Sequence, residues 1–110
     1  MKGGTVYVMT FKAFPNLVKV GRTRASLAAR VDGVSREYGS RATLAYGVST
    51  EHYEKLEKDV HCELHGMDRH EVGECFRATV DETVEIFQKL LNPAFTLSYW
   101  ANNISSRKTA

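Results

Sequence analysis

Two short runs of β-branched and aromatic residues near the N-terminus constrain the fold more than any other feature of the sequence. Residues 4–11 read Gly-Thr-Val-Tyr-Val-Met-Thr-Phe, and residues 17–21 read Leu-Val-Lys-Val-Gly. Both compositions are typical of β-strands. The Pro15–Asn16 pair between the two runs signals a turn. We therefore predict an antiparallel hairpin with residues 12–16 as its loop.

Apolar residues at helical spacing follow the hairpin twice. The first helix can begin at a cap formed by Thr23 or Ser26 and end at Gly39, and the second can end at Gly66. Between the two helices, residues 42–49 again have the composition of a strand. Each helix has one apolar face, which consists of Leu27, Val31, Val34 and Tyr38 in the first and of Tyr53, Leu56, Val60 and Leu64 in the second.

Residues 75–91 predict a short strand followed by a third helix. Residues 75–78 have strand-like composition, and Thr79 and Glu82 have the spacing of a helix capping box. Asn92, followed by a proline, would stop the helix. Its apolar positions are Val84, Phe87, Leu90 and Leu91.

The predicted order is strand, strand, helix, strand, helix, strand, helix, which indicates an α+β fold. A chain of 110 residues has the size of one small domain. We expect residues 1–92 to form it, with a small, mainly antiparallel sheet flanked by helices. Residues 93–110 are expected to form a C-terminal arm, either a short edge strand or a segment across the core, with a frayed end. Tyr99 and Trp100 in this arm are candidates for an interface, for stacking on bases, or for the core.

The charges of the chain are unevenly distributed. Residues 1–50 carry eight Lys or Arg and two acids, whereas residues 51–100 carry five Lys or Arg and eleven acids. A basic first half fits contact with phosphate groups, and a mutual ion-pair surface is the other reading. Two cysteines do not make a disulfide framework, and no apolar stretch approaches the ~20 residues of a membrane span. We expect a soluble, cytoplasmic protein that does not enter membranes.

Tyr7 and Lys19 are the first candidates for chemistry. Side chains alternate along a strand, so both should point away from the valines beside them and share one face of the hairpin. A phenol and an amine side by side, with Gly21 allowing close approach to the backbone, can form a phosphate or water site. The alternative is an ordinary solvated hairpin face.

The two helices supply further candidates. Arg30 lies at the edge of the first apolar face, where it can clamp a phosphate or cover the edge of the core. Glu57, His61 and His65 follow one another at four-residue spacing on the second helix. Glu57 could hold a divalent cation, and His61 could act as a base or orient a water molecule. The alternative is a polar stripe stabilised by pairs four residues apart.

A competing metal site is also present in the pattern. Cys62, His65, His70 and Cys75 have the ligand spacing of a zinc knuckle in which one cysteine is replaced by histidine. A knuckle requires a short loop from residue 62, whereas the apolar periodicity continues the helix through Leu64. The sequence therefore leaves zinc as the less favoured reading.

The hairpin and the second helix together resemble the GIY-YIG endonuclease superfamily, and in particular its small phage- and bacteria-associated branch. The resemblance covers residues 4–91, and lysine stands where other members have the second motif tyrosine. An arginine in the first helix, an L-E-x-x-x-H stretch and a late E-x-F element complete it. The matching motifs are Thr5-Val6-Tyr7, Lys19-Val20-Gly21 followed by Arg22-Thr23, Arg30, Leu56-Glu57 with His61, and Glu74-Cys75-Phe76.

The resemblance implies a metal-dependent DNA endonuclease, a hydrolase of phosphodiester bonds. Glu57 would hold one Mg²⁺ or Mn²⁺, and Arg30 would stabilise the phosphate in the transition state. Tyr7, alone or with Lys19, would accept a proton from the attacking water or orient it. His61 completes the expected catalytic set. We expect DNA contacts from the basic residues Lys12, Arg22, Arg24, Arg36 and Arg41.

The sequence departs from the superfamily at two positions and leaves a second function open. The late asparagine of some members has no convincing match, although Asn92 is available. Val34 stands where many members have a tyrosine or histidine, and Tyr38, His52 or His61 could take that role. A homodimer is expected if both DNA strands are cut. The alternative function is a catalytically inactive module that binds nucleic acid or a protein partner, such as a phage accessory or inhibitor protein.

Overall fold

The computed structural model describes residues 3–91, and the fold is an antiparallel sheet with helices on both of its faces. The sheet has five strands in the order β3-β1-β2-β5-β4, and every neighbouring pair is antiparallel. This confirms the expected α+β class. In chain order the elements are β1 (Gly4–Phe11), β2 (Leu17–Thr23), α1 (Leu27–Tyr38), β3 (Ala42–Thr50), α2 (Tyr53–Gly66), β4 (His70–Val72), β5 (Cys75–Arg77) and α3 (Val80–Leu91).

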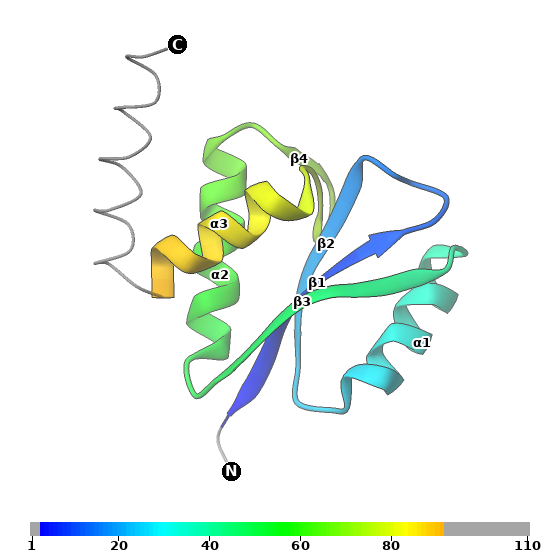
Figure 1. Cartoon of the computed structure of the whole chain (residues 1–110), viewed down its shortest axis with the longest axis horizontal. Helices are drawn as coiled ribbons and strands as arrows, with labels where there is room; N and C mark the ends of the chain where they lie inside the picture. Colours follow the sequence, from blue (N-terminus) through cyan, green and yellow to red (C-terminus); the bar gives the residue numbers. More distant parts are fainter. Residues whose placement is uncertain (1–2, 92–110) are drawn as a thin grey trace.

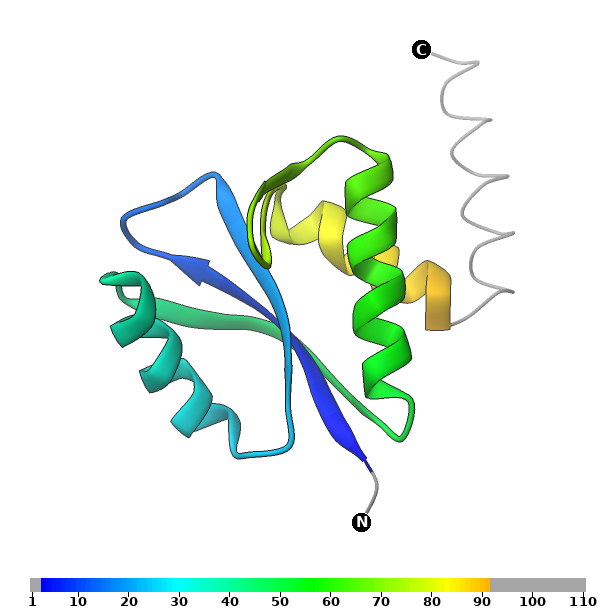
Figure 2. The ribbon, with the colours of Figure 1, turned by 180° about the vertical axis from the view of Figure 1, so that it is seen from behind.

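The sheet separates two hydrophobic clusters, one under each set of helices. Figure 1 shows α1 on one side of the strands and α2 with α3 on the other, and the view from behind in Figure 2 agrees. Val6, Val8, Val18 and Val20 point toward α2 and α3, as the alternation in the hairpin predicts. The cluster under α1 instead contains Tyr7, Met9, Phe11, Val34, Ala42 and Cys75.

The hairpin forms as expected, but its second face is not solvated. In the register of β1 and β2, Tyr7 lies opposite Gly21 and Met9 opposite Lys19. The relative exposure of Tyr7 is 0% and that of Lys19 is 2%. The reading of this face as an ordinary solvated surface is therefore wrong. The reason is tertiary, since α1 packs across the strands and covers the face that the hairpin alone would leave open.

The helix ends follow the expected local chemistry. The side chain of Ser26, not of Thr23, caps α1 by accepting a hydrogen bond from the Ala29 backbone at 3.2 Å. Gly39 ends the helix in the left-handed region, with φ of 61°. The predicted capping box is also present, because the Thr79 hydroxyl and the Glu82 carboxylate each accept a hydrogen bond from the other residue's backbone.

Two details of the last third differ from the sequence-based expectation. The sequence does not predict strand β4, because its three residues show no alternation of apolar side chains. In the structure all three are exposed. In α3, the apolar spacing predicts a buried Leu91, but this residue is exposed, whereas Thr83, Ile86 and Phe87 are buried. The expected arm at residues 93–110 lies outside the described residues. Within residues 3–91, every helix is too short or too polar to cross a membrane.

Candidate functional site

Tyr7 and Arg30 form the first part of the candidate site. The Tyr7 ring lies directly over Gly21, where a Cβ in place of the glycine hydrogen would come within 2.6 Å of ring carbon Cζ and closer still to the hydroxyl. The Nε of Arg30, on α1, donates a hydrogen bond to the Tyr7 hydroxyl at 3.0 Å. This hydrogen bond raises the pKa of Arg30 above its usual value. The glycine thus makes room for the phenol, and the arginine covers the hydroxyl.

Lys19 lies on the same face but has a different partner. Its ammonium group forms an ion pair with the Glu74 carboxylate, and its Nζ lies 5.6 Å from the centre of the Tyr38 ring. Burial works to lower the pKa of Lys19, but the hydrogen bond with Glu74 and the nearby negative charge raise it overall. Tyr7 and Lys19 are therefore neighbours that are held by separate partners.

Glu57 provides a buried carboxylate on α2. Its Oε1 lies 3.6 Å from Nη1 of Arg22, while its Oε2 is buried and has no hydrogen-bond partner among the described residues. Burial raises the pKa of Glu57, and the charge of Glu74 raises it further, against the lowering effects of His61, Arg22 and Lys19. An orphaned buried carboxylate oxygen is costly, and a hard cation is a partner that suits it.

His61 lies one helical turn beyond Glu57 and contacts the backbone of β2. Its Nε2 lies 2.7 Å from the Val20 carbonyl oxygen. A carbonyl can only accept, so Nε2 of His61 carries a proton and donates it in this hydrogen bond. The backbone amide of the same residue, Val20, donates a hydrogen bond to the Glu74 carbonyl at 3.0 Å. β2 at Val20 is thus fixed both to α2 and to the turn before β5.

The two halves of the site meet at the open end of β2. β5 pairs with β2 only from Leu17 to Lys19, so the rest of β2 continues beyond it. Tyr7 and Lys19 lie on the α1 face there, and Glu57 lies on the α2 face. The charges of Glu74 and Lys19 act on the pKa of Glu57 across this edge. The structure therefore brings the expected catalytic residues around one stretch of backbone.

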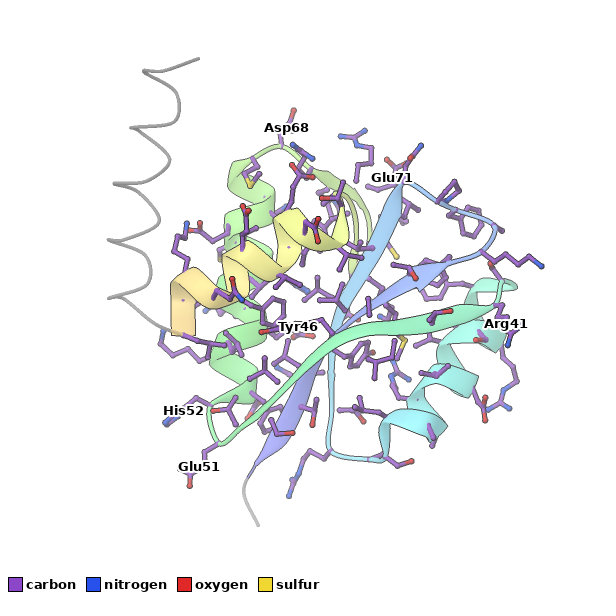
Figure 3. All side chains as sticks on the ribbon, viewed as in Figure 1. Arg41, Tyr46, Glu51, His52, Asp68 and Glu71 are labelled. Atoms are coloured by element: carbon purple, nitrogen blue, oxygen red, sulfur yellow. The ribbon has the colours of Figure 1, made fainter. Side chains whose placement is uncertain are left out.

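The expected DNA-contact residues are all exposed, but they form two groups. Arg22 and Arg24 precede α1, whereas Arg36 and Arg41 lie at its other end. Lys12 joins the second group, because its amide donates to the Arg41 carbonyl at 3.0 Å. Figure 3 shows Arg41 beside the end of α1. A helix of 12 residues separates the groups by about 18 Å, so only the first adjoins Glu57.

The zinc reading is not supported by the structure. Phe76 contacts the rings of His65 and His70, at centroid distances of 5.4 and 5.6 Å, on the α2 face. Cys75, the preceding residue of β5, points to the α1 face, and Cys62 is exposed on α2. Within residues 3–91, no three His, Cys, Asp or Glu residues converge to hold a metal. The knuckle spacing fails because α2 runs straight through residues 62–65.

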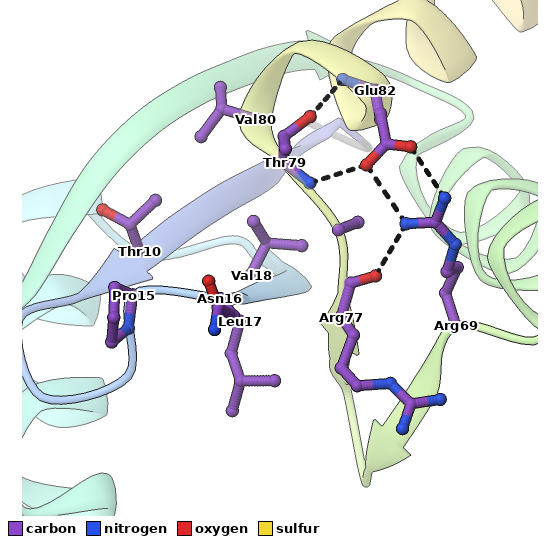
Figure 4. Close-up of a pocket in the computed structure, with 11 residues that line it drawn as sticks. Thr10, Pro15, Asn16, Leu17, Val18, Arg69, Arg77, Thr79, Val80 and Glu82 are labelled. Atoms are coloured by element: carbon purple, nitrogen blue, oxygen red, sulfur yellow. Dashed lines mark hydrogen bonds and ion pairs between the residues drawn. The ribbon is translucent and has the colours of Figure 1, made fainter.

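A surface pocket of about 370 Å³ lies away from these residues, between the start of β2 and the start of α3. Figure 4 shows its polar wall, in which Arg69 bonds both carboxylate oxygens of Glu82 and the carbonyl of Arg77. Arg69 and Glu82 are thus paired with each other, and Glu82 is also part of the capping box with Thr79. We interpret the pocket as a by-product of the ion pair that fixes α3.

Sequence reasoning does not assign Glu74 a place in the site. The signal is present in the E-x-F element, but nothing in its spacing shows that the carboxylate reaches Lys19, 55 residues earlier. Tyr38, one of three candidates for the missing aromatic or histidine, does lie beside Lys19. His52 lies in the turn before α2, at the end of the molecule where Figure 3 labels it.

Comparison with known proteins identifies the family of the chain. A search of curated proteins and a search of solved structures each found no match. The family model of the T5orf172 domain matches residues 4–91, the stretch that carries the sheet and helices α1, α2 and α3. The chain therefore belongs to the T5orf172 domain family, a phage-associated domain of endonuclease-like type.

Proposed function

We propose that this protein is a metal-dependent DNA endonuclease that uses GIY-YIG-type chemistry. The observation that carries the proposal is the carboxylate of Glu57, which has one buried oxygen without a partner among the described residues and the other beside Arg22. A structural glutamate would be paired through both oxygens or left in water. A carboxylate held in this state fits a ligand that comes from outside the chain.

Glu57 would hold a single Mg²⁺ or Mn²⁺. One protein carboxylate is enough for Mg²⁺, which keeps several water molecules and takes further oxygens from phosphate. When bound, the ion would supply polarisation of the scissile phosphate and stabilisation of the leaving oxygen.

The arginines would bind the phosphate. Arg22 is exposed, and its contacts with Glu57 and Glu54, at 3.6 and 3.9 Å, are long enough to be exchanged for a phosphate. Arg30 is half-buried, and its hydrogen bond with Tyr7 uses Nε, so its other guanidinium nitrogens could be directed to a phosphate. Both side chains would stabilise negative charge that builds up on the phosphate in the transition state.

Tyr7 would orient the attacking water through its hydroxyl oxygen. That oxygen is covered by Arg30 in the structure, so the water would reach it as Arg30 turns to the phosphate. His61 would fix β2 against α2 through Val20 and lower the pKa of Glu57. Tyr7, Arg30, Glu57 and His61 then each have a task that their contacts allow.

A cleavage assay with two glutamate variants tests the proposal. Wild type, Glu57→Gln and Glu54→Gln are incubated with supercoiled, linear and branched DNA in Mg²⁺, Mn²⁺ or EDTA. Glu54 is the matched control, because it also lies beside Arg22 on α2 but is exposed. We expect metal-dependent nicking by wild type and Glu54→Gln and none by folded Glu57→Gln. Cleavage by Glu57→Gln at the wild-type rate would remove Glu57 from the mechanism.

One observation favours the alternative of a binding module without turnover. The Tyr7 hydroxyl is fully covered, and the charge of Lys19 is neutralised within the protein. If folded wild type binds DNA and leaves every substrate intact in both metals, the alternative holds. A partner protein then becomes the next question.

A further inference from the structure

Lys19 places a charged group inside the hydrophobic cluster under α1. Its side chain has 2% relative exposure, and the ring of Tyr38 covers its Nζ at 5.6 Å. Water cannot solvate an ammonium group in that position. A buried amine must then either lose its proton or have an anion beside it.

Glu74 is that anion. Its carboxylate forms the ion pair with Lys19, and its backbone carbonyl accepts a hydrogen bond from Val20, the next residue of β2. The residue is thus attached to two consecutive positions of the strand. Removing the carboxylate would leave the ammonium group without a counter-charge in an apolar setting.

The other titratable groups around Lys19 do not replace Glu74. The phenols of Tyr7 and Tyr38 and the thiol of Cys75 face it from β1, α1 and β5, and its charge in turn lowers the pKa of Glu57 on α2. Burial raises the pKa of Tyr38 and of Cys75, so both stay neutral at physiological pH. Burial also works to lower the pKa of Lys19, and the interaction with Glu74 reverses this effect.

We infer that Glu74 is a positioning residue of the site, whose carboxylate keeps Lys19 as an ammonium group that is neutralised within the protein. Lys19 then orders the α1 face of the sheet around Tyr7 and Tyr38 and does not bind the substrate phosphate. The catalytic part of this inference rests on the proposed function. The state of Lys19 does not. Phosphate binding then falls to Arg22 and Arg30, whose guanidinium groups reach the surface.

The protonation of Lys19 can be measured directly in the full-length, metal-free protein. Nuclear magnetic resonance of isotope-labelled lysine side chains follows each Nζ from neutral pH to pH ~11, and a Lys19→Met variant assigns the signal. We expect Lys19 to keep its proton at least as high in pH as the exposed lysines. Loss of the proton at lower pH than the exposed lysines overturns the inference, and this result needs no variant of Glu74.

Two acid variants test the role of Glu74. Glu74→Gln keeps the shape and removes the charge, and Glu71→Gln is the matched control. The two carboxylates are similarly exposed, at 41% and 43%, but Glu71, on the edge strand β4, pairs with Arg77 on β5. We expect at least a tenfold lower proton affinity of Lys19 in Glu74→Gln and no change in Glu71→Gln. An unchanged titration in folded Glu74→Gln contradicts the assignment.

DNA binding tests the claim about phosphate. Affinity for a short duplex is measured against salt concentration for wild type, Lys19→Met and Arg22→Gln. A residue that neutralises a phosphate reduces the salt dependence by about one unit of slope. We expect that reduction in Arg22→Gln and none in Lys19→Met, and an equal reduction in both overturns the inference. If wild type fails to cleave DNA, the proposed function fails while the titration still decides the state of Lys19.

Discussion

The guanidinium group of Arg30 donates a hydrogen bond to the hydroxyl of Tyr7 at 3.0 Å, which joins α1 to β1, an interior strand of the sheet. The contact links residues 23 positions apart. It also covers the hydroxyl of a side chain whose relative exposure is 0%. The pair therefore has both a structural and a proposed catalytic consequence, and substitutions can separate them.

Tyr7→Phe removes the acceptor of this hydrogen bond and keeps the ring. We expect the free energy of unfolding to fall by about 1 kcal/mol, because Arg30 is half-buried and can turn to water. Cleavage should fall more strongly, by about a hundredfold, if the hydroxyl orients the attacking water. Urea unfolding and a nicking assay measure the two effects. Equal, small losses in both would leave Tyr7 a purely structural residue.

Gly21→Ala should be among the most disruptive single-methyl additions in the sheet. The new Cβ would lie 2.6 Å from Cζ of Tyr7, and the ring is fixed by the strands around it. We expect a loss of about 1–3 kcal/mol in the free energy of unfolding. Gly47→Ala on β3 is the control, because the nearest atom to its Cβ lies at 3.6 Å. Equal stabilities of the two variants in urea would show that the ring can move aside.

Glu57→Gln should stabilise the metal-free protein at neutral pH. Burial raises the pKa of Glu57 in the folded state, so folding favours the protonated form. The stability that wild type has below the unfolded pKa of about 4.3 is then lost as pH rises through the folded value. Glu57→Gln escapes this loss, and its advantage over wild type should disappear in acid. Unfolding curves at several pH values in EDTA measure the difference.

Divalent metal should make wild type more stable than Glu57→Gln, the reverse of their order without metal. A cation that binds only folded wild type stabilises it by about 1.4 kcal/mol when its concentration is ten times the dissociation constant. Glu57→Gln lacks the ligand and should gain little. Thermal unfolding with and without Mg²⁺ or Mn²⁺ reports this without any DNA. An equal gain in both proteins would place the metal elsewhere.

Glu82→Gln should weaken the start of α3, with the opposite dependence on pH. The backbone amide of Thr79, and then the side chain of Arg69, lower the pKa of Glu82. The stability that this carboxylate contributes is therefore present above its unfolded pKa and lost as pH falls through the folded value. We expect the variant to be less stable than wild type by about 1 kcal/mol at neutral pH and equal to it in strong acid. Circular dichroism during urea unfolding at both pH values checks the sign.

The sequence by itself determined the local elements of this protein. The alternating valines of the hairpin, the end of α1 at Gly39 and the capping box before α3 are each encoded within a few residues, where propensity and hydrogen bonding act without the rest of the chain. For the start of α1 the sequence left Thr23 and Ser26 as alternatives, and the structure shows Ser26. The alternation also placed Tyr7 and Lys19 on one face, because successive side chains of a strand point in opposite directions.

Only the tertiary structure decided what that face does. Packing of α1 made it a buried surface and gave Tyr7 the guanidinium of Arg30. The zinc reading lost its support because α2 continues through residues 62–65 and Cys75 faces away from the histidines. The pairing of β2 with β5 brought Glu74 to Lys19. These contacts join residues far apart in the chain, and burial sets their strength, since it removes the water that would otherwise separate the charges.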